Sequence, residues 1–551
     1  MVSRSLVLLL LSTLAAAGPS VTVLNGTYEG YSLPASRQDV FLGLPYAQPP
    51  LGSLRFRGPQ SLNTTWSGAR PAVEYSDGWY LQADPGYPIS EDCLTLNVVR
   101  PNTGGGNSSL KLPVAVWIHG GGLYSGSSRA TNLTNFVSQG TASNNAFIAV
   151  SINYRLSAFG FLAGSDEDSL SANNGLRDQR LALAWIQENI GFFGGDARKV
   201  TIFGESSGGL SVGKQLIAYG GRDDGLFRAA IMQSGGMAEK WPYNIKDPVV
   251  YTRGLYTNLT DATGCAGSCS PLECLRGLPL PALSAALNLT DTPVFSGTGL
   301  GPWLTQVDGD FLTDGPTESL TSGRFVPVPI IYTTMTDEAT VFGFVDSVDT
   351  ASDFRSFIAA GGPDAETTAV IENMYAQEPG LPAGWTPTAS DLATYGAYWK
   401  RSVAFHTDVT ETCSRRQTLN SWTKAGGTAY SARINILDPA SAARLGSSHG
   451  VDVDYVFDNV DESADGLRDM ATLMSRVWAS FVVHLDPNFH RLRGAPVWPA
   501  WNGSAADCTV GSNFVFNTNG SVESRSYLEL DDYRLEQTRY LSSVMQSQMY
   551  Y

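Results

Sequence analysis

The chain has 551 residues, of which 43% are hydrophobic and 16% charged, and it carries a net charge of −16 with a pI near 4.8. This apolar content excludes a chain that is disordered throughout, and the acidic balance argues against binding polyanions such as nucleic acid. No Pro/Ser-rich linker divides the sequence, so we expect one large α/β domain over residues 18–551.

The first 17 residues have the features of a secretory signal peptide. Arg4 provides a basic start, residues 6–11 form an apolar run, and small residues follow at 15–17. The run is shorter than the roughly 20 residues that a membrane-spanning helix needs. We therefore expect cleavage near Ala17, a secreted mature chain and no transmembrane segment.

Two further features fit export. Six cysteines, an even number, favour disulfides in an oxidising compartment, and the sequence alone leaves every pairing open. The Asn-x-Ser/Thr acceptor pattern for N-glycosylation also recurs along the chain. Its positions are Asn25, Asn63, Asn107, Asn132, Asn258, Asn288, Asn502 and Asn519.

The mature chain opens with a predicted hairpin. Asn25-Gly26, a dipeptide that favours a tight type I′ turn, lies between the short segments 21–24 and 27–31. A small antiparallel sheet is expected there.

From Pro113 onward the apolar pattern changes to short β-branched runs without alternation. Such runs predict strands that are covered on both faces, as in a mainly parallel sheet. The expected strands are residues 114–118, 147–152, 200–203, 229–232, 328–332 and 429–436. Apolar residues at helical spacing predict a covering helix over 175–191, and a C-terminal helix is expected over 531–549.

The strongest local pattern is the G-x-S-x-G pentapeptide 204–208, directly after the expected strand 200–203. Glycines on both sides of the serine permit the sharp turn that exposes a nucleophile at a strand end. An ordinary Gly/Ser loop is the alternative, and the preceding strand argues against it. Ser206 is therefore the predicted nucleophile. Its neighbour Glu205 either tunes the site electrostatically or is a hydrogen-bonded buried carboxylate.

A second glycine-rich segment, His119-Gly120-Gly121-Gly122, follows the expected strand 114–118. Acyl transfer places negative charge on a carbonyl oxygen, and glycine N–H groups can approach that oxygen closely. We expect Gly121, Gly122 and the N–H of Ser207 to form an oxyanion hole. The alternative is a flexible triglycine loop like residues 104–106, and the position at a strand end favours function.

A serine nucleophile needs a base, and five histidines are available. The chain order nucleophile, acid, histidine excludes His119. We expect His406 inside a helix, and His484 and His490 at the surface beside a helix end. His449 lies in the small-residue loop 446–450, after the last apolar strand, where its imidazole is free to reach another strand end.

The acid must lie between Ser206 and His449 at another strand end. Asp337 and Glu338 follow the expected strand 328–332 by a few residues. Of the two, we choose Glu338.

These residues, together with several longer blocks, resemble the type-B carboxylesterase family, which includes fungal lipases, sterol esterases and cholinesterases. The resemblance runs through residues 41–47, 90–98, 153–155 and 174–179 to the nucleophile, and covers nearly the whole mature chain. It implies an α/β-hydrolase fold, with a large, mostly parallel central sheet covered by helices on both faces. It also implies the triad Ser206, Glu338 and His449, with the oxyanion hole named above. Ala339 stands where the family typically has glycine.

Two departures from the family bear on the substrate. Members usually have a cysteine upstream that pairs with the counterpart of Cys93, and residues 18–92 contain none. The segment 66–90 is also short, so we expect no large mobile lid and favour soluble or small esters over triglycerides. The tryptophan that cholinesterases use for quaternary ammonium would fall near Ala83, four residues from Trp79, which argues against a choline site.

The resemblance further implies a disulfide between Cys265 and Cys274. Cys413 and Cys508 are our second suggested pair, and Cys93 and Cys269 remain unassigned.

We therefore expect a secreted serine hydrolase that cleaves carboxylic esters through an acyl-enzyme on Ser206, with no metal or cofactor. A lipase or sterol esterase acting on long-chain lipid esters is the alternative. A non-catalytic adhesion protein on the same fold would typically lose the serine or histidine, whereas this chain keeps both. The sequence specifies neither the acyl and alcohol groups nor the oligomeric state.

Overall fold

The computed structural model describes residues 18–548 except for eleven internal segments. Those segments are 79–86, 103–110, 165–171, 238–247, 291–300, 343–346, 379–385, 438–443, 461–466, 505–509 and 519–525. The expected signal peptide, residues 1–17, also lies outside the described residues.

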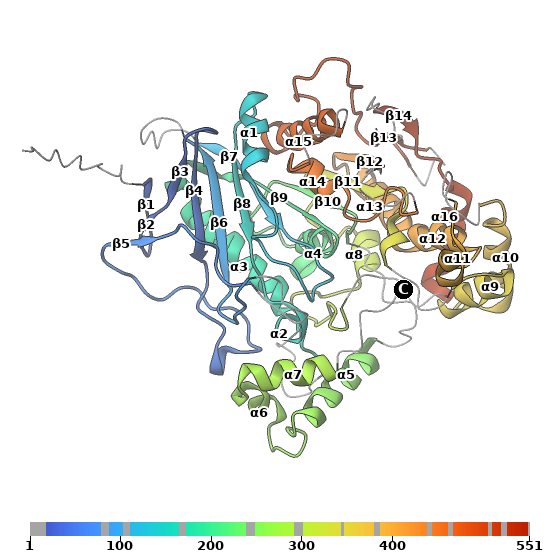
Figure 1. Ribbon diagram of the computed structural model, residues 1–551, viewed down its shortest axis with the longest axis horizontal. Helices are drawn as coiled ribbons and strands as arrows, with labels where there is room; N and C mark the ends of the chain where they lie inside the picture. Colours follow the sequence, from blue (N-terminus) through green and yellow to red (C-terminus); the bar gives the residue numbers. More distant parts are fainter. Residues whose placement is uncertain are drawn as a thin grey trace, which may run out of the picture.

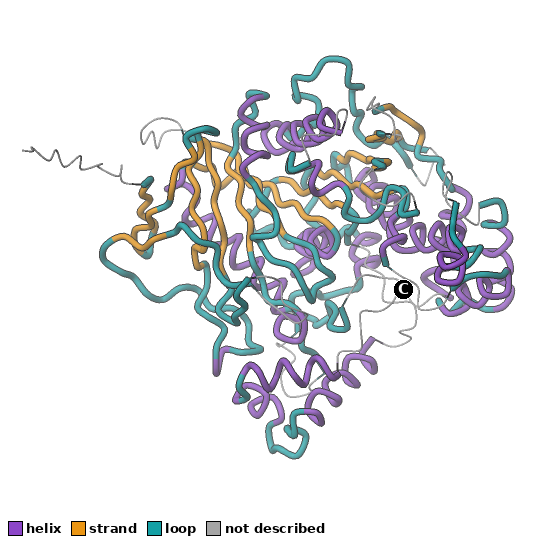
Figure 2. Tube along the Cα trace, viewed as in Figure 1, coloured by secondary structure: helices purple, strands orange, loops and turns teal. Residues whose placement is uncertain are grey.

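A central sheet of 11 strands runs through the molecule (Figures 1 and 2) in the order β14-β13-β12-β11-β10-β9-β7-β8-β6-β4-β3. Its middle, from β8 to β13, is parallel, and both ends are antiparallel. The parallel strands are β7 (Leu112–Ile118), β8 (Ile148–Ile152), β9 (Gly195–Glu205), β10 (Ala229–Gln233), β11 (Ile330–Met335), β12 (Ala429–Asn435) and β13 (Ser512–Asn517). The outer strands are β3 (Tyr31–Leu33), β4 (Gln38–Pro45), β6 (Thr95–Pro101) and β14 (Tyr527–Leu530). Each of the six strands expected from apolar runs is present.

Helices cover both faces of the sheet, as alternate residues of β7 show. Val114 and Val116 face one core cluster, which includes α3 (Asn174–Asn189) and α4 (Ser207–Gly221). Ala115 and Trp117 face the other, which includes α1 (Thr134–Ala142) and α15 (Leu467–His484). Because both faces are buried, the strand has no polar alternation, and the sequence could identify it only as a continuous apolar run.

Most of the remaining helices form two groups in Figure 1. One is a projection at the bottom of the view, made of α5 (Pro248–Ala262), α6 (Pro271–Gly277) and α7 (Leu280–Thr290). The other, at the right, contains α9 (Ala351–Ala360), α10 (Ala365–Met374), α11 (Ala389–Tyr395), α12 (Trp399–Thr407) and α16 (Leu535–Gln548). The other helices are α2 (Ser157–Phe161), α8 (Pro316–Ser322), α13 (Cys413–Lys424) and α14 (Asp452–Val456). Short 3₁₀ or π turns occupy Gly52–Leu54, Ile190–Phe193, Glu338–Val341 and Asp408–Thr412.

The N-terminal sheet differs from its prediction in two ways. Strands β1 (Ser20–Val23) and β2 (Gly26–Glu29) form the expected antiparallel hairpin, but β5 (Ala69–Pro71) pairs with β2 in parallel. The turn is Leu24-Asn25, one residue earlier than predicted, and Gly26 already pairs with Val23. A side chain at Gly26 would begin 2.3 Å from the Trp66 ring, so glycine is needed there for packing rather than for the turn.

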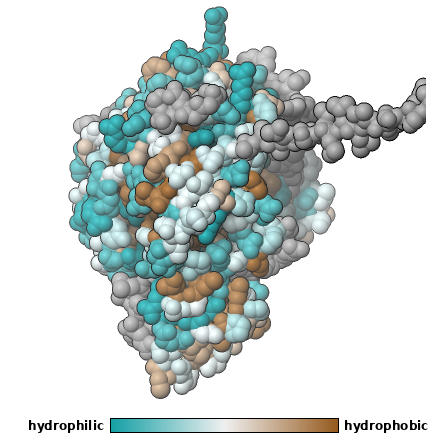
Figure 3. Space-filling model, turned by 90° about the vertical axis from the view of Figure 1, so that its left-hand side faces the viewer, coloured by the Kyte–Doolittle hydropathy of each residue, from teal (hydrophilic) through white to brown (hydrophobic). Residues whose placement is uncertain are grey.

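The face at the left of Figure 1 carries apolar residues in separate patches. Figure 3 shows the face at the left of Figure 1, where brown hydrophobic groups alternate with teal hydrophilic ones. Across the described ranges, no helix combines the length and the apolar character that crossing a bilayer requires.

Candidate active site

Ser206 stands at the turn between β9, which ends at Glu205, and α4, which begins at Ser207. Its backbone has φ 59° and ψ −129°, a conformation that side chains rarely adopt. Two hydrogen bonds hold it there: its N–H donates to the carbonyl of Gln233 at 2.8 Å, and its own carbonyl accepts from Leu210 at 2.9 Å. The strained turn is thus fixed by the next strand and by the first turn of the helix.

The two glycines of the pentapeptide allow the backbones around Ser206 to pack closely. A side chain at Gly208 would begin 2.1 Å from the carbonyl oxygen of Ile118, at the end of β7. One at Gly204 would begin 2.5 Å from the backbone of Gly208 itself. Real Cβ contacts are never this short, so any side chain here would push the serine turn away from β7.

The glycine segment after β7 packs directly against the serine turn. A side chain at Gly120 would begin 3.0 Å from both the Ser206 Cβ and the Glu205 Oε2. Gly121 and Gly122 have φ values of 107° and 64°, which favour glycine. Within the described part of the chain, the N–H groups of these two residues make no hydrogen bond. They are therefore available to a ligand.

His119 is held by its neighbours rather than facing a partner that it could deprotonate. Its ring stacks on Tyr154 with centroids 4.5 Å apart, and its Nδ1 lies 2.8 Å from the carbonyl oxygen of Gly120. The Tyr154 hydroxyl donates to its carbonyl at 2.8 Å. Burial lowers the pKa of His119 to about 4, so the imidazole is neutral at neutral pH.

The imidazole of His449 lies beside Glu338. Its Nδ1 is 2.7 Å from the Glu338 Oε2, and the second carboxylate oxygen accepts the N–H of Met335 at 2.7 Å. The carboxylate of Glu338 is fully buried, and the Phe342 ring lies 4.7 Å from the imidazole ring. With Nδ1 donating to Glu338, the Nε2 of His449 lies 3.2 Å from the Oε1 of Glu205, the residue before Ser206.

Asp337, the weaker candidate for the acid, does not contact His449. One of its oxygens pairs with Lys400 and the other accepts the N–H of Ser447 at 3.1 Å. The two adjacent acidic side chains therefore have different environments, and Glu338 is the one that meets the histidine.

The sequence left two roles open for Glu205, electrostatic tuning of the site or a buried, hydrogen-bonded carboxylate. Its Oε1 lies 3.2 Å from the His449 Nε2, outside hydrogen-bond geometry, and its side chain is 10% exposed. Burial, together with the nearby carboxylates of Asp452 and Glu338, raises the pKa of Glu205 against the opposing effect of His449. Burial alone would lower the pKa of His449, but Glu205 and Glu338 outweigh it and raise that pKa. The two groups thus compete for one proton.

A second buried acid adjoins this pair. Asp452 accepts the side-chain amide of Gln233 at 2.7 Å, and Gln233 in turn accepts the indole N–H of Trp478 at 3.0 Å. Burial raises the pKa of Asp452 to about 7. Asp452 was not predicted from the sequence, although its position three residues after His449, at the start of α14, could have indicated it.

The other histidines lie elsewhere. His406 is buried in α12, as expected, and His484 ends α15 with its Nε2 2.9 Å from the Asn145 Oδ1. The expectation that His490 lies at the surface is wrong. Its side chain is buried and accepts the N–H of Leu492, because the chain after α15 folds back onto the helix instead of ending in solvent.

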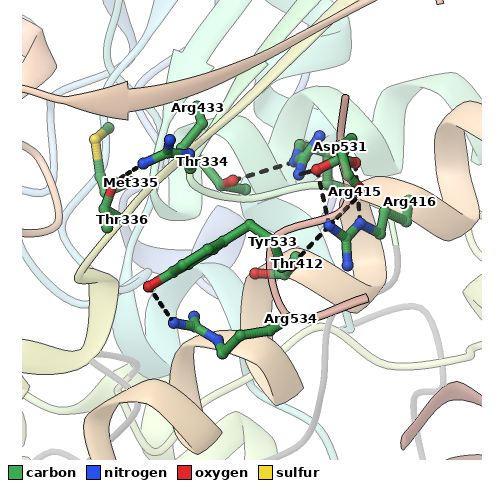
Figure 4. A pocket seen from close by; sticks show the side chains of 10 residues that line it. All are labelled: Thr334, Met335, Thr336, Thr412, Arg415, Arg416, Arg433, Asp531, Tyr533 and Arg534. Atoms are coloured by element: carbon green, nitrogen blue, oxygen red, sulfur yellow. Dashed lines mark hydrogen bonds and ion pairs between the residues drawn. The ribbon is translucent and has the colours of Figure 1, made fainter. Parts of the chain in front are cut away.

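Four arginines surround the end of β11, the strand that leads to Glu338 (Figure 4). Arg415 donates to Thr334 and Arg433 donates to Thr336. Asp531 forms ion pairs with both Arg415 and Arg416, at 2.9 and 2.8 Å. The guanidinium groups are already paired with carboxylates, so this cluster anchors the C-terminal segment to β11 rather than offering an anion site.

The cysteines follow the expectations in part. Cys265 and Cys274 form the disulfide that the resemblance implies. Cys508 lies outside the described residues, so its pairing with Cys413 stays a prediction; the Cys413 sulfur is 3.5 Å from the carbonyl oxygen of Thr538. Cys93 is buried as a free thiol, and Cys269 is exposed.

Trp79 and Ala83, on which the argument against a choline site depended, also lie outside the described residues, as do the sequons Asn107 and Asn519.

Comparison with known proteins gives a consistent result. A family described as "Carboxylesterase family" matches residues 17–513. Lipase 5 of Diutina rugosa is 36% identical over 93% of this chain and 94% of its own length. A secreted triacylglycerol lipase of Gibberella zeae is 33% identical over 93% of this chain and 90% of its own. Among solved structures, Aspergillus niger EstA is similar with a TM-score of 0.81 and 28% identity, covering 97% of this chain and 99% of that one.

Proposed function

This chain belongs to the carboxylesterase family and is a carboxylic-ester hydrolase, and from this premise we propose that Ser206, His449 and Glu338 carry out the reaction. In the proposed mechanism the Ser206 Oγ attacks the ester carbonyl carbon while its proton passes to the His449 Nε2. Glu338 stabilises the resulting imidazolium. The N–H groups of Gly121, Gly122 and Ser207 bind the oxyanion.

The tetrahedral intermediate then collapses. The bond to the alcohol oxygen breaks, His449 gives its proton to that oxygen, and Ser206 is left acylated. In the second half, water attacks the acyl carbon while His449 accepts its proton. The bond between the acyl carbon and the Ser206 Oγ then breaks, His449 returns the proton to Oγ, and the acid product leaves. Proton and charge return to their starting places, so the cycle needs no external cofactor.

The observation that carries this proposal is the 2.7 Å contact between the His449 Nδ1 and the Glu338 Oε2, with Nε2 beside Glu205, the residue before Ser206. It supports an imidazole that keeps a proton on Nδ1 and, once deprotonated at Nε2, can accept the proton of the serine there. A histidine that only packs would not need a fully buried carboxylate on one nitrogen and, among the described residues, a second nitrogen that makes no hydrogen bond.

A fluorophosphonate probe tests the nucleophile, since it labels activated serines. We expect labelling at Ser206 in the wild type and none in Ser206→Ala. Glu338→Gln then tests the acid: the amide favours the wrong tautomer, which should reduce kcat by about 10³- to 10⁴-fold. Asp337→Asn should cost far less. Equal losses in these two variants would contradict the assignment of the acid.

For the substrate class we propose soluble or small esters over triglycerides. Residues 18–92 contain no cysteine to pair with Cys93, and the segment 66–90, where a lid would lie, is short. The second candidate is a lipase, and it is favoured by the lipase names of the relatives. p-Nitrophenyl esters of rising chain length separate the two. A sharp rise in rate above the solubility limit of a long-chain ester supports the lipase.

We also propose that the protein is secreted and glycosylated. Two relatives are named as secreted lipases, and residues 1–17 have signal-peptide character. Five described sequon asparagines are exposed, namely Asn63, Asn132, Asn258, Asn288 and Asn502. Asn25 is half-buried and its amide nitrogen donates to Thr64, which makes it the poorest described acceptor. Peptide mass spectrometry of the protein exported by a fungal host, before and after deglycosylation, tests both points.

A further inference from the structure

We propose that Asp337 is a positioning residue for ester hydrolysis, whose carboxylate holds the loop carrying His449 against the turn carrying Glu338. This inference rests on the proposed function, because it concerns how two of the proposed catalytic residues are kept together. It gives a role to the acidic neighbour that was set aside as a candidate acid.

Asp337 and Ser447 form a reciprocal pair of hydrogen bonds. The N–H of Asp337 donates to the carbonyl of Ser447 at 3.0 Å, and the N–H of Ser447 donates back to the Asp337 Oδ2 at 3.1 Å. Glu338 is the next residue on one side of this pair, and His449 is two residues further on the other. A shift between Asp337 and Ser447 would therefore be passed almost directly to the contact between Glu338 and His449.

The loop is held on its other side as well. The Ser447 hydroxyl donates to the carbonyl of Ile434 at 2.9 Å and accepts the N–H of Ile436 at 3.1 Å, both at the end of β12. The Thr340 hydroxyl donates to the carbonyl of Leu445 at 2.7 Å. The end of β12 thus fixes one side of the loop, while Thr340 and the Asp337 carboxylate both tie it to the acid turn, Thr340 at Leu445 and Asp337 at Ser447, closer to His449.

The backbone of the loop is shaped to this carboxylate. Gly446 has φ 61°, and a side chain there would begin 2.3 Å from the Asp337 Oδ2. Only glycine permits the loop to lie this close to the acid. The chain therefore passes directly over the Asp337 side chain, which is 7% exposed.

The second carboxylate oxygen is engaged by another element. Lys400 on α12 pairs with the Asp337 Oδ1, and its side chain is 15% exposed. A buried carboxylate needs such a partner to remain charged and oriented. One side chain thus joins three segments: the acid turn, the histidine loop and helix α12.

The test compares Asp337→Ala and Asp337→Asn, with rates expressed per active site titrated by the fluorophosphonate. Alanine removes every side-chain contact, and asparagine keeps an oxygen for the Ser447 N–H. We expect kcat to fall about 100-fold in the alanine variant and about tenfold in the asparagine variant, with KM changed by less than about threefold.

The pH profile separates positioning from mere stability. At acidic pH, kcat/KM should rise with pH as His449 loses its proton, and we call this rise the acidic limb. A looser contact with Glu338 lowers the pKa of His449, so the acidic limb should move to lower pH. The other acids that act on His449 are Glu205 on β9, Asp452 on α14 and Glu411 in the π turn, and all three remain in these variants. Both variants also lose the charge of Asp337 and its pairing with Lys400, so the Glu338 contact is reported by the further movement of the alanine variant beyond the asparagine variant.

Asp408→Asn is the matched control. Asp408 is also a fully buried aspartate paired with a cation, Arg534, but it touches neither the acid turn nor the histidine loop. The Asp408→Asn variant should be less stable than wild type, while the acidic limb of its kcat/KM stays in place. If both Asp337 variants keep kcat per site within about twofold of wild type, or keep the wild-type limb, the inference is wrong. If Ser206→Ala is itself fully active, the proposed function is what has failed.

Discussion

Replacing Glu205 by glutamine should move the acidic limb of kcat/KM to lower pH. The glutamine keeps the size of the side chain and removes its charge. In the wild type the Glu205 Oε1 lies 3.2 Å from the His449 Nε2 and favours the protonated imidazole, which cannot act as a base. Without that carboxylate His449 loses its proton at lower pH, so the enzyme should remain active in more acidic solution.

The distance brackets the size of the shift. Two unit charges 3.2 Å apart interact by about 5 kcal/mol at an effective dielectric constant of about 20, and by about 1.3 kcal/mol in bulk water. Since about 1.4 kcal/mol corresponds to one pKa unit, the limb should move by about 1 to about 4 pH units. Because the pKa of Glu205 is raised, its carboxyl group is only partly ionised over the pH range of the acidic limb. We therefore expect a shift nearer to one pH unit than to four.

The same interaction stabilises the imidazolium that forms during acylation. The plateau of kcat/KM should therefore fall as well, by about tenfold or more. The assay is hydrolysis of a soluble p-nitrophenyl ester between pH 4 and pH 9, corrected for active-site content. Glu529→Gln is the control, since Glu529 pairs with Arg433 and is not among the acids that raise the pKa of His449. An unmoved limb in Glu205→Gln, or an equal shift in the control, would refute this reasoning.

Three further outcomes follow from the described contacts. Ser206→Ala and His449→Ala should each reduce kcat by roughly 10⁴- to 10⁶-fold, and more than a tenth of the activity surviving in a rate assay would reject the assignment. Serine at both Cys265 and Cys274, which are 9 residues apart, should lower the free energy of unfolding by about 2–3 kcal/mol in a denaturant titration. Burial would raise the pKa of Asp531, but its two arginine partners outweigh burial and lower it. Its ion pairs therefore stabilise the fold fully above the ordinary aspartate pKa, and this stabilisation is lost as the pH falls below that value. Asp531→Asn should therefore cost about 3–5 kcal/mol at pH 7, and the loss of melting temperature should shrink below about pH 4.

The sequence was most informative where one physical requirement dominates. Strands buried on both faces must be apolar throughout, which is why β7 and β10 could be recognised without alternation. The pentapeptide around Ser206 was equally clear, because two glycines are needed for backbone contacts as short as that between Gly208 and Ile118. His449 was predicted as the base because the other four histidines were set aside and because small residues form its loop.

Other features depend on contacts between distant segments, and no local pattern records those. The parallel pairing of β5 with β2 joins residues about forty positions apart. His490 seemed exposed because it follows a helix end, and only the return of the chain buries it. The contacts of Asp337 with Lys400 and Ser447 likewise connect three separate segments, so the sequence could offer Asp337 only as a rival to Glu338.

Two kinds of constraint meet at the serine turn. The position of the turn is set by backbone packing: a side chain at Gly235 would begin 2.1 Å from the Ser206 carbonyl oxygen, and one at Gly120 would begin 2.8 Å from that of Glu205. The protonation of the site is set separately, by carboxylates supplied from β9, the acid turn and α14. Substitution of a carboxylate should therefore change the pH at which the site works while leaving its shape. Substitution of one of these glycines should abolish activity at every pH, because it displaces the serine from the N–H groups that would bind the oxyanion.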